Sequence, residues 1–420
     1  MTLSRFPSLV AIAAALSVGA MIAAPPALAQ RSQQKPPQQQ QQGPGLSSKE
    51  LAAALQESLN ALNAKDYATA KVKLDAAAAL AKTPQDKVEL ERLRVPMASS
   101  TQDWANLVVY LQNALDTGLL TPEQAKAYKY GFVQAYANLK DDPKTTSHLR
   151  SYVDEFGGTP EQTFAVGQAL LKANDVTGVA YVEKAITAAK AAGKPTEGQY
   201  KLLMNGYTIA KDDAKYYDAL EQLITAYPTD NNWKGYIAKA QTAPGFAASG
   251  KEIRIDIYRA ALGAGVKLSP IELSNYADET VQKGLPGEAV SALEPFKAEL
   301  GAPAQATLAN ANKKSAEDKA GLAKDEKNTL AKGSGEAIAN LGEAFMTYGD
   351  HAKAVELMKA GLAKGVGDAG KTDIVKLHLG IAQYKSGDKA GAQATWAEIK
   401  SDNGSAILAK MWTTISKVKA

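Results

Sequence analysis

One segment near the C-terminus has the residue types and spacing of a phosphate-binding loop. From Gly365 to Thr372 the sequence reads Gly-Val-Gly-Asp-Ala-Gly-Lys-Thr, which matches G-x-x-x-x-G-K-[ST] and also contains G-x-G-x-x-G. In such a loop glycine N–H groups surround the phosphates, the lysine reaches the terminal phosphate and the threonine holds magnesium. This chemistry requires a buried strand before the loop, whereas residues 352–364 have the apolar spacing of an amphipathic helix. We interpret the match as a coincidence of turn glycines and keep a nucleotide hydrolase as an alternative.

Other residues that could catalyse reactions or bind metals are sparse. The three histidines are His148, His351 and His378, and none lies four residues from another, so no helical metal pair can form. Their convergence in space stays open, and we interpret them as solvated or packing histidines. The segment Asp230–Gln241 resembles a calcium loop, but Lys234 stands at a ligand position and a glutamine replaces the bidentate glutamate. We expect no cofactor, no metal and no enzymatic activity.

The N-terminus predicts export. Arg5 precedes an apolar run over residues 9–20, and Ala27 and Ala29 form a small-x-small cleavage pattern. We therefore predict a signal peptide over residues 1–29, with cleavage after Ala29, and a periplasmic or secreted protein without a later membrane span. Residues 30–46 are rich in glutamine and proline and lack the apolar surface needed to fold, so we predict a disordered tether.

The amino-acid composition limits the chemistry and the classes of partner that we expect. The chain has no cysteine, which excludes disulfides and thiolate chemistry, and its 48 basic and 44 acidic residues leave a net charge of only +4. A chain so nearly balanced is not expected to bind nucleic acid. We expect a protein or peptide partner, and the oligomeric state stays open.

The elements that carry these residues are helices. Leu51, Leu55, Leu59 and Leu62 follow one another at spacings of four, four and three, which places them on one helix face. Ser-Pro and Thr-Pro pairs recur as helix starts, in which the hydroxyl caps the helix and proline takes its first turn. We predict an array of helix hairpins over residues 47–300.

A pattern of five residues near the C-terminus occurs twice, with an offset of 38 residues. A fixed offset of this size indicates stacked repeats. We expect the glycines and alanines of this pattern to let helices approach closely, and its leucines to fill the space between the helices. The first copy comprises Leu341, Gly342, Gly349, Asp350 and Ala354, and the second Leu379, Gly380, Gly387, Asp388 and Ala392.

These residues resemble the tetratricopeptide repeat (TPR). That family has Leu-Gly in its first helix, a Gly-Asp turn, a small residue early in the second helix and a larger apolar one a turn later, here Met358 and Trp396. A partial version occurs at Asp66, Ala70 and Leu74, and the middle of the chain lacks the Leu-Gly signature. The resemblance implies an all-α fold, an α-solenoid of stacked antiparallel helix hairpins.

Two further segments complete the predicted organisation. Residues 301–335 are rich in charged residues and alanine, and we predict a helical linker, with an exposed partner arm as the alternative and residues 333–335 as a hinge. Residues 336–420 would hold two TPR-like repeats and a capping helix over 405–418, because an open-ended stack needs a cover.

We therefore predict a non-catalytic scaffold for protein–protein interaction in the cell envelope. The resemblance implies that first helices line a concave face, which would bind a peptide or a partner helix. A scaffold that binds envelope glycan or lipid is the main alternative, and an aromatic stripe on that face would favour it. By register, the predicted partner-binding residues are Glu343, Met346, Thr347, Ile381, Tyr384 and Lys385.

Overall fold

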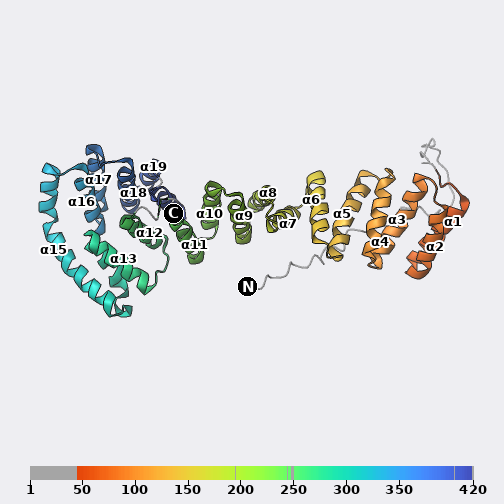
Figure 1. The fold of residues 1–420 in the computed structure, drawn as a ribbon, viewed down its shortest axis with the longest axis horizontal. Coiled ribbons are helices and arrows are strands. Elements are labelled where there is room, and N and C mark those ends of the chain that lie inside the picture. Colours follow the sequence, from red (N-terminus) through yellow and green to blue (C-terminus); the bar gives the residue numbers. More distant parts are fainter. Residues whose placement is uncertain (1–44, 194, 244, 247–249, 402, 419–420) are drawn as a thin grey trace, which may run out of the picture. The chain divides into compact units, whose positions relative to one another are not determined.

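The computed structural model describes residues 45–418 except 194, 244, 247–249 and 402 (Figure 1). The predicted signal peptide and nearly all of the predicted tether lie outside the described residues. Within them the regular structure is helical and no strand occurs, which confirms the all-α prediction. No helix in this part of the chain combines the length and apolar character needed to cross a membrane. The described residues divide into two compact units, unit 1 before and unit 2 after the boundary at residue 194.

Unit 1 consists of four helix hairpins. In each hairpin the two helices pack against each other, and each hairpin also packs against the next along the chain. This neighbour-only packing is the definition of a solenoid. The helices are α1 (Lys49–Asn63), α2 (Tyr67–Leu80), α3 (Pro84–Ser100), α4 (Trp104–Asp116), α5 (Pro122–Asn138), α6 (Asp142–Phe156), α7 (Pro160–Lys172) and α8 (Gly178–Ala191).

Unit 2 contains four further hairpins, α9–α10, α13–α14, α16–α17 and α18–α19, with single helices between and after them. Its first helices are α9 (Glu197–Ala210), α10 (Asp213–Ala226), α11 (Asp230–Gln241), α12 (Gly250–Ala264), α13 (Pro270–Lys283) and α14 (Pro286–Leu293). After the 3₁₀ helix η2 (Glu294–Glu299) follow α15 (Ala302–Lys332), α16 (Gly335–Thr347), α17 (His351–Lys364), α18 (Ala369–Lys385), α19 (Lys389–Ala397) and α20 (Ser405–Val418).

One turn geometry joins the helices of seven hairpins. A residue one or two positions after the end of the first helix has a positive φ, and an aspartate follows it. The aspartate N–H donates to the carbonyl five residues earlier, at 2.8–3.2 Å, and this bond closes the first helix. The pairs are Lys65–Asp66, Gln102–Asp103, Lys140–Asp141, Asn174–Asp175, Lys211–Asp212, Gly349–Asp350 and Gly387–Asp388.

These turns show that the repeat runs through both units. The first five aspartates follow one another at 34 to 38 residues, close to the 38 that separates Asp350 from Asp388. In six turns the aspartate carboxylate also accepts an N–H bond from the start of the second helix, which caps that helix. The hairpin α13–α14 closes through the same backbone bond, with Gly284 and Leu285 in place of the pair.

The repeated glycines permit close helix packing as predicted. A Cβ on Gly342 would lie 2.9 Å from Cγ of Met358, and one on Gly380 would lie 2.6 Å from Cδ1 of Trp396. The Trp396 indole is buried, and its N–H donates to the carbonyl of Leu377 at 3.2 Å. The second helix of each of these two hairpins therefore lies directly on the glycine of the first.

The charged segment after residue 300 is one continuous helix, α15, of 31 residues. Its N-terminal half buries Ala304 and Leu308 against α13 and α14. Its C-terminal half reaches the next hairpin, where Asp318 accepts a hydrogen bond from Tyr348 and Glu326 pairs with Lys353 at 2.6 Å. The helix thus joins two hairpins along their length.

The last helix, α20, has the predicted bounds and covers α18 and α19. It also packs against α10 and α12, which the sequence did not predict. The Trp412 ring lies on Gly263 of α12, where a Cβ would be 2.5 Å from Cη2 of the indole. Unit 2 therefore closes on itself, because its last helix contacts helices near its start.

Candidate binding face and buried ionic cluster

The phosphate-loop motif forms a turn between two helices. Helix α17 ends at Lys364, and α18 begins at Ala369. Gly365 and Gly367 have φ of 96° and 105°, which only glycine adopts readily. The strand that a phosphate loop requires is replaced by the second helix of a hairpin, as expected from the apolar spacing.

The side chains of this motif are occupied by helix contacts. The Asp368 carboxylate caps α18 by accepting the Lys371 N–H at 2.9 Å, so a negative charge stands where a phosphate would bind. The Lys371 ammonium pairs with Glu336 at 2.9 Å, and the Thr372 hydroxyl donates to the Asp368 carbonyl at 2.9 Å. This arrangement stabilises a helix start and repels an anion.

Half of the predicted partner-binding residues are not on the surface. Glu343, Met346 and Ile381 have exposed fractions of 4%, 4% and 0%. The predicted positions lie too close to the C-terminal ends of α16 and α18, because other helices of unit 2 cover those ends. Helix α14 lies against the C-terminal end of α16, where a Cβ on Gly287 would be 2.8 Å from Oγ1 of Thr347.

The other three predicted residues differ in their surroundings. Thr347 is half-buried, and its hydroxyl donates to the Ala344 carbonyl at 2.8 Å. Tyr384 is half-buried with its ring 6.3 Å from that of Trp396, whereas Lys385 is exposed. A partner contact at Thr347, Tyr384 and Lys385 stays a prediction.

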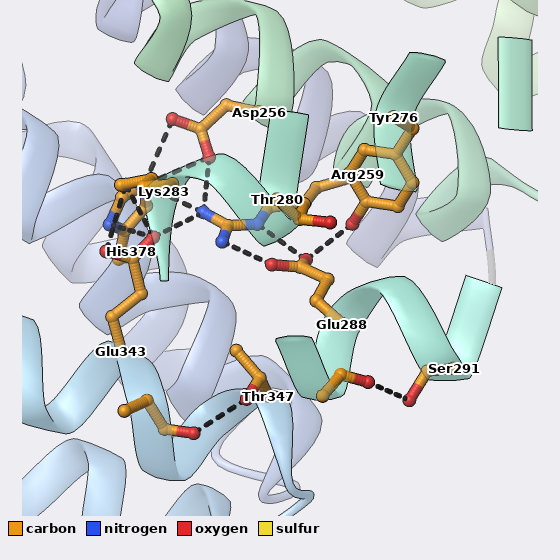
Figure 2. A network of polar contacts seen from close by, with 12 residues as sticks. Asp256, Arg259, Tyr276, Thr280, Lys283, Glu288, Ser291, Glu343, Thr347 and His378 are labelled. Atoms are coloured by element: carbon orange, nitrogen blue, oxygen red, sulfur yellow. Dashed lines mark hydrogen bonds and ion pairs between the residues drawn. The ribbon is translucent and has the colours of Figure 1, made fainter. Parts of the chain in front are cut away.

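A buried ionic cluster joins the inner sides of five helices in unit 2 (Figure 2). Arg259 of α12 is its hub, with a side chain only 3% exposed. Its guanidinium donates two parallel hydrogen bonds to Glu288 of α14, at 2.7 and 2.6 Å. It also contacts Asp256 on its own helix at 2.8 Å and Glu343 of α16 at 2.9 Å. One arginine thus bridges three carboxylates.

Two more groups extend the cluster to α13 and α18. The Lys283 ammonium donates to both oxygens of Glu343, at 2.9 and 3.0 Å. Nε2 of His378 lies 2.9 and 3.0 Å from the two oxygens of Asp256, 122 residues away in sequence. The Tyr276 hydroxyl donates to Glu288 at 2.5 Å. The cluster therefore links α12, α13, α14, α16 and α18.

Electrostatics inside the cluster favours the charged forms. Burial alone would raise the pKa of Glu343, but the neighbouring His378, Arg259 and Lys283 outweigh it and hold this pKa well below its ordinary value. The pKa of Asp256 is lowered for the same reasons, against its own burial. Burial disfavours the charge on Arg259, but Glu288 and Glu343 raise its pKa further above its ordinary value. The carboxylates are therefore ionised and held by cations.

A pocket of about 70 Å³ opens beside this cluster, between α13, α16, α17 and α18. Its inner end is formed by Lys283, Glu343 and His378, and apolar side chains of α16, α17 and α18 complete its walls. At the exposed end lie Asn340 and the ion pair Glu336–Lys371. On α16, Asn340 and Glu336 lie about one and two turns before Glu343, and on α18 Lys371 lies nearly three turns before Ile381. We call this surface the α16–α18 face.

The three histidines have different environments. His148 stacks on Phe132 at 4.8 Å between ring centroids, as expected of a packing histidine. His351 is half-buried at the start of α17. The interpretation as a solvated or packing histidine was wrong for His378, which is buried and lies among charged side chains. Its partners lie on helices far away in sequence, so no local signal marks it.

The sequence has no match to a protein-family model and none to a curated protein. Solved structures similar to this chain include a tetratricopeptide repeat protein from Parabacteroides merdae, at 11% identity and a TM-score of 0.28, with 78% of this chain and 98% of that one covered. Another is the TPR2AB domain of yeast Sti1 in complex with pHSP90, at 10% identity and a TM-score of 0.21, with coverages of 70% and 99%.

A third is Naa15/Naa10 bound to HypK-THB, at 16% identity and a TM-score of 0.30, with 82% of this chain and 57% of that chain covered. The structural class follows from the helix hairpins of this chain. With recurrent turns and glycine-mediated packing, the protein is an all-α array of TPR-like helix hairpins.

Proposed function

We propose that this protein is a non-catalytic scaffold for protein–protein interaction, exported to the cell envelope, that binds an extended peptide or a partner helix. Export is supported by the signal-like sequence of residues 1–29. Mass spectrometry of the protein purified from the envelope fraction tests this step. We expect the mature chain to begin at Gln30, and a full-length chain in the cytoplasm would contradict it.

The proposed binding of a peptide rests on the polar and apolar side chains that lie together on the α16–α18 face. Asn340 is exposed there, and its amide makes no hydrogen bond with another described residue. An asparagine amide can both donate to and accept from a peptide backbone. The apolar pocket walls beside it could hold a short side chain of the partner. The hollow of about 70 Å³ is lined by polar and apolar side chains together, so it suits one small side chain of a partner that binds across the surrounding face.

Charge at the mouth of the pocket is balanced, which suits a peptide better than a polyanion. Glu336 and Lys371 pair with each other and are about half-exposed, so either can exchange its partner for a group of opposite charge on a ligand. Such an exchange costs little because exposed ion pairs contribute only about 0–1 kcal/mol. The face can therefore adapt to peptides of different charge.

Selection from a random peptide-display library with the mature chain tests the function. We expect enriched peptides that bind wild-type protein and bind Asn340→Ala about tenfold more weakly, because one peptide hydrogen bond of about 1.4 kcal/mol is lost. Asn312→Ala, on the exposed side of α15, is the matched control and should bind as wild type. Failure to enrich any peptide, or equal binding by both variants, would refute this site.

A further inference from the structure

The pocket of the α16–α18 face has an ion pair at its inner end. The Lys283 ammonium donates to both oxygens of Glu343, at 2.9 and 3.0 Å, and the two side chains are 21% and 5% exposed. Both residues line the pocket, one from α13 and the other from α16 (Figure 2). A group that fills the pocket therefore meets a positive and a negative side chain together at its inner end.

The Glu343 carboxylate can accept one further hydrogen bond. Its Oε1 accepts from Lys283 and lies 2.9 Å from Nη1 of Arg259. Its Oε2 accepts a hydrogen bond from Lys283 only, among the described residues. An ionised carboxylate has about four lone-pair sites on its two oxygens, so Oε2 has capacity left for a second donor. A hydroxyl placed beside it would donate without displacing an existing contact.

The volume and the walls of the pocket fit a short, branched side chain. The space of about 70 Å³ corresponds to about two to three heavy atoms, since a water molecule occupies about 30 Å³ in the liquid. Ala339, Met358 and Val366, each at most 2% exposed, supply apolar contact. A methyl group that leaves water and packs against such side chains is stabilised. Long charged side chains and aromatic side chains exceed this space.

The charges around the pocket favour a neutral side chain. The charged residues of its lining form two ion pairs, Lys283–Glu343 at the inner end and Glu336–Lys371 at the mouth. The imidazole of His378, also at the inner end, lies against Asp256, with Nε2 at 2.9 Å from the nearer oxygen. A carboxylate in the pocket would stand beside Glu343, and an ammonium would stand beside Lys283. A charge that leaves water without a partner of its own is costly.

We propose, on the basis of the peptide-binding function proposed above, that this pocket takes the side chain of a threonine of the partner. The threonine hydroxyl donates to Oε2 of Glu343, and its methyl group packs against Met358 and Val366. The exposed amide of Asn340 at the mouth bonds to the partner backbone nearby. Valine lacks the hydroxyl, glycine leaves the pocket empty, and aspartate and lysine introduce a charge. Threonine meets the conditions of size, polarity and neutrality together.

Peptides selected on the mature chain test this choice of side chain. We expect threonine to be enriched at one position of the peptides whose binding depends on Asn340. Fluorescence anisotropy then measures the Kd of one such peptide and of forms in which this threonine is replaced. Valine has nearly the same shape and should weaken binding about tenfold through the lost hydrogen bond. Aspartate and lysine should weaken it more than valine does.

Val375→Leu gives a matched test from the side of the protein. Val375 is half-buried on α18 and lines the pocket, so leucine there narrows the pocket and leaves Asn340 in place. We expect this variant to bind the glycine form of the peptide as wild type does, and the threonine form about tenfold more weakly than wild type. A preference for threonine equal to that of wild type would place the side chain elsewhere and overturn the proposal.

The proposed function and the threonine pocket fail in different ways. Peptides that need Asn340 but bind equally with threonine, valine or glycine would refute the pocket and leave the binding face. A library without enriched peptides, or peptides indifferent to Asn340→Ala, would refute the face and the pocket with it. The peptide series on wild-type protein decides between threonine and its replacements even if Val375→Leu does not fold.

Discussion

Arg259→Met is the substitution that tests the ionic cluster most severely. It removes a guanidinium with an exposed fraction of 3% that contacts Asp256, Glu288 and Glu343 at 2.6–2.9 Å. Methionine fills part of the volume but supplies no charge, so Glu288 loses both of its ionic hydrogen bonds. Breaking a buried ion pair by removing one partner costs about 3–5 kcal/mol. Because three carboxylates lose a partner at once, we expect the upper end of that range.

The assay is urea unfolding of the full chain with a fluorescence signal confined to unit 2. A Trp104→Phe background removes the tryptophan of unit 1 and leaves three in unit 2, namely Trp233, Trp396 and Trp412. Arg254→Met on the same helix is the matched control, because Arg254 is half-exposed and pairs with Glu279 at 3.0 Å. Such a pair contributes about 0–1 kcal/mol. If the two variants lose stability equally, the cluster does not hold unit 2 together.

Four further outcomes are expected. Gly380→Ala should lower the urea midpoint, because overpacking against the buried Trp396 costs about 1–3 kcal/mol, more than the gain in helix propensity. Gly387→Asn should lower the free energy of unfolding by about 1 kcal/mol or less in the same assay. Gly387→Val should lower it more, because a β-branched residue tolerates the φ of 94° poorly. Asp86→Ala should destabilise unit 1 and remove an acid-dependent loss of stability seen by circular dichroism. Its buried carboxylate accepts three backbone N–H bonds that hold its pKa below the ordinary value despite burial, so wild type loses this contribution as the pH falls. Calorimetric titration with Mg·ATP should give no binding in wild type or Lys371→Ala, and saturable binding lost in the variant would reinstate the phosphate loop.

The helices and their packing could be predicted from the sequence because their signals are local. Thr-Pro and Ser-Pro pairs do start α3, α5, α7 and α13 with a capping box. The repeat in unit 1 was mostly missed because lysine, glutamine or asparagine replaces the turn glycine. Lys140 and Asn174 take left-handed conformations with φ of 58°, which is uncommon for residues other than glycine. A search for aspartates about 37 residues apart would have found these turns.

The candidate site could be predicted only in part, because it depends on how unit 2 closes. Glu343 was identified as an inner-face residue from its register, and it does line the pocket. Its burial follows from Arg259 and His378, which lie on helices distant in sequence. Spacing along one helix contains no information on such contacts. Likewise, nothing in residues 405–418 indicates that α20 returns to α10 and α12.

Hydrogen exchange of the full chain with and without a selected peptide tests most directly whether the α16–α18 face binds partners. Backbone amides of a peptide-bound helix open less often and exchange more slowly. We expect slower exchange on peptide binding in residues 336–343 and 371–378, and none of this protection in Asn340→Ala at the same peptide concentration. Protection confined to other helices, or unchanged exchange with bound peptide, would contradict the proposed scaffold face.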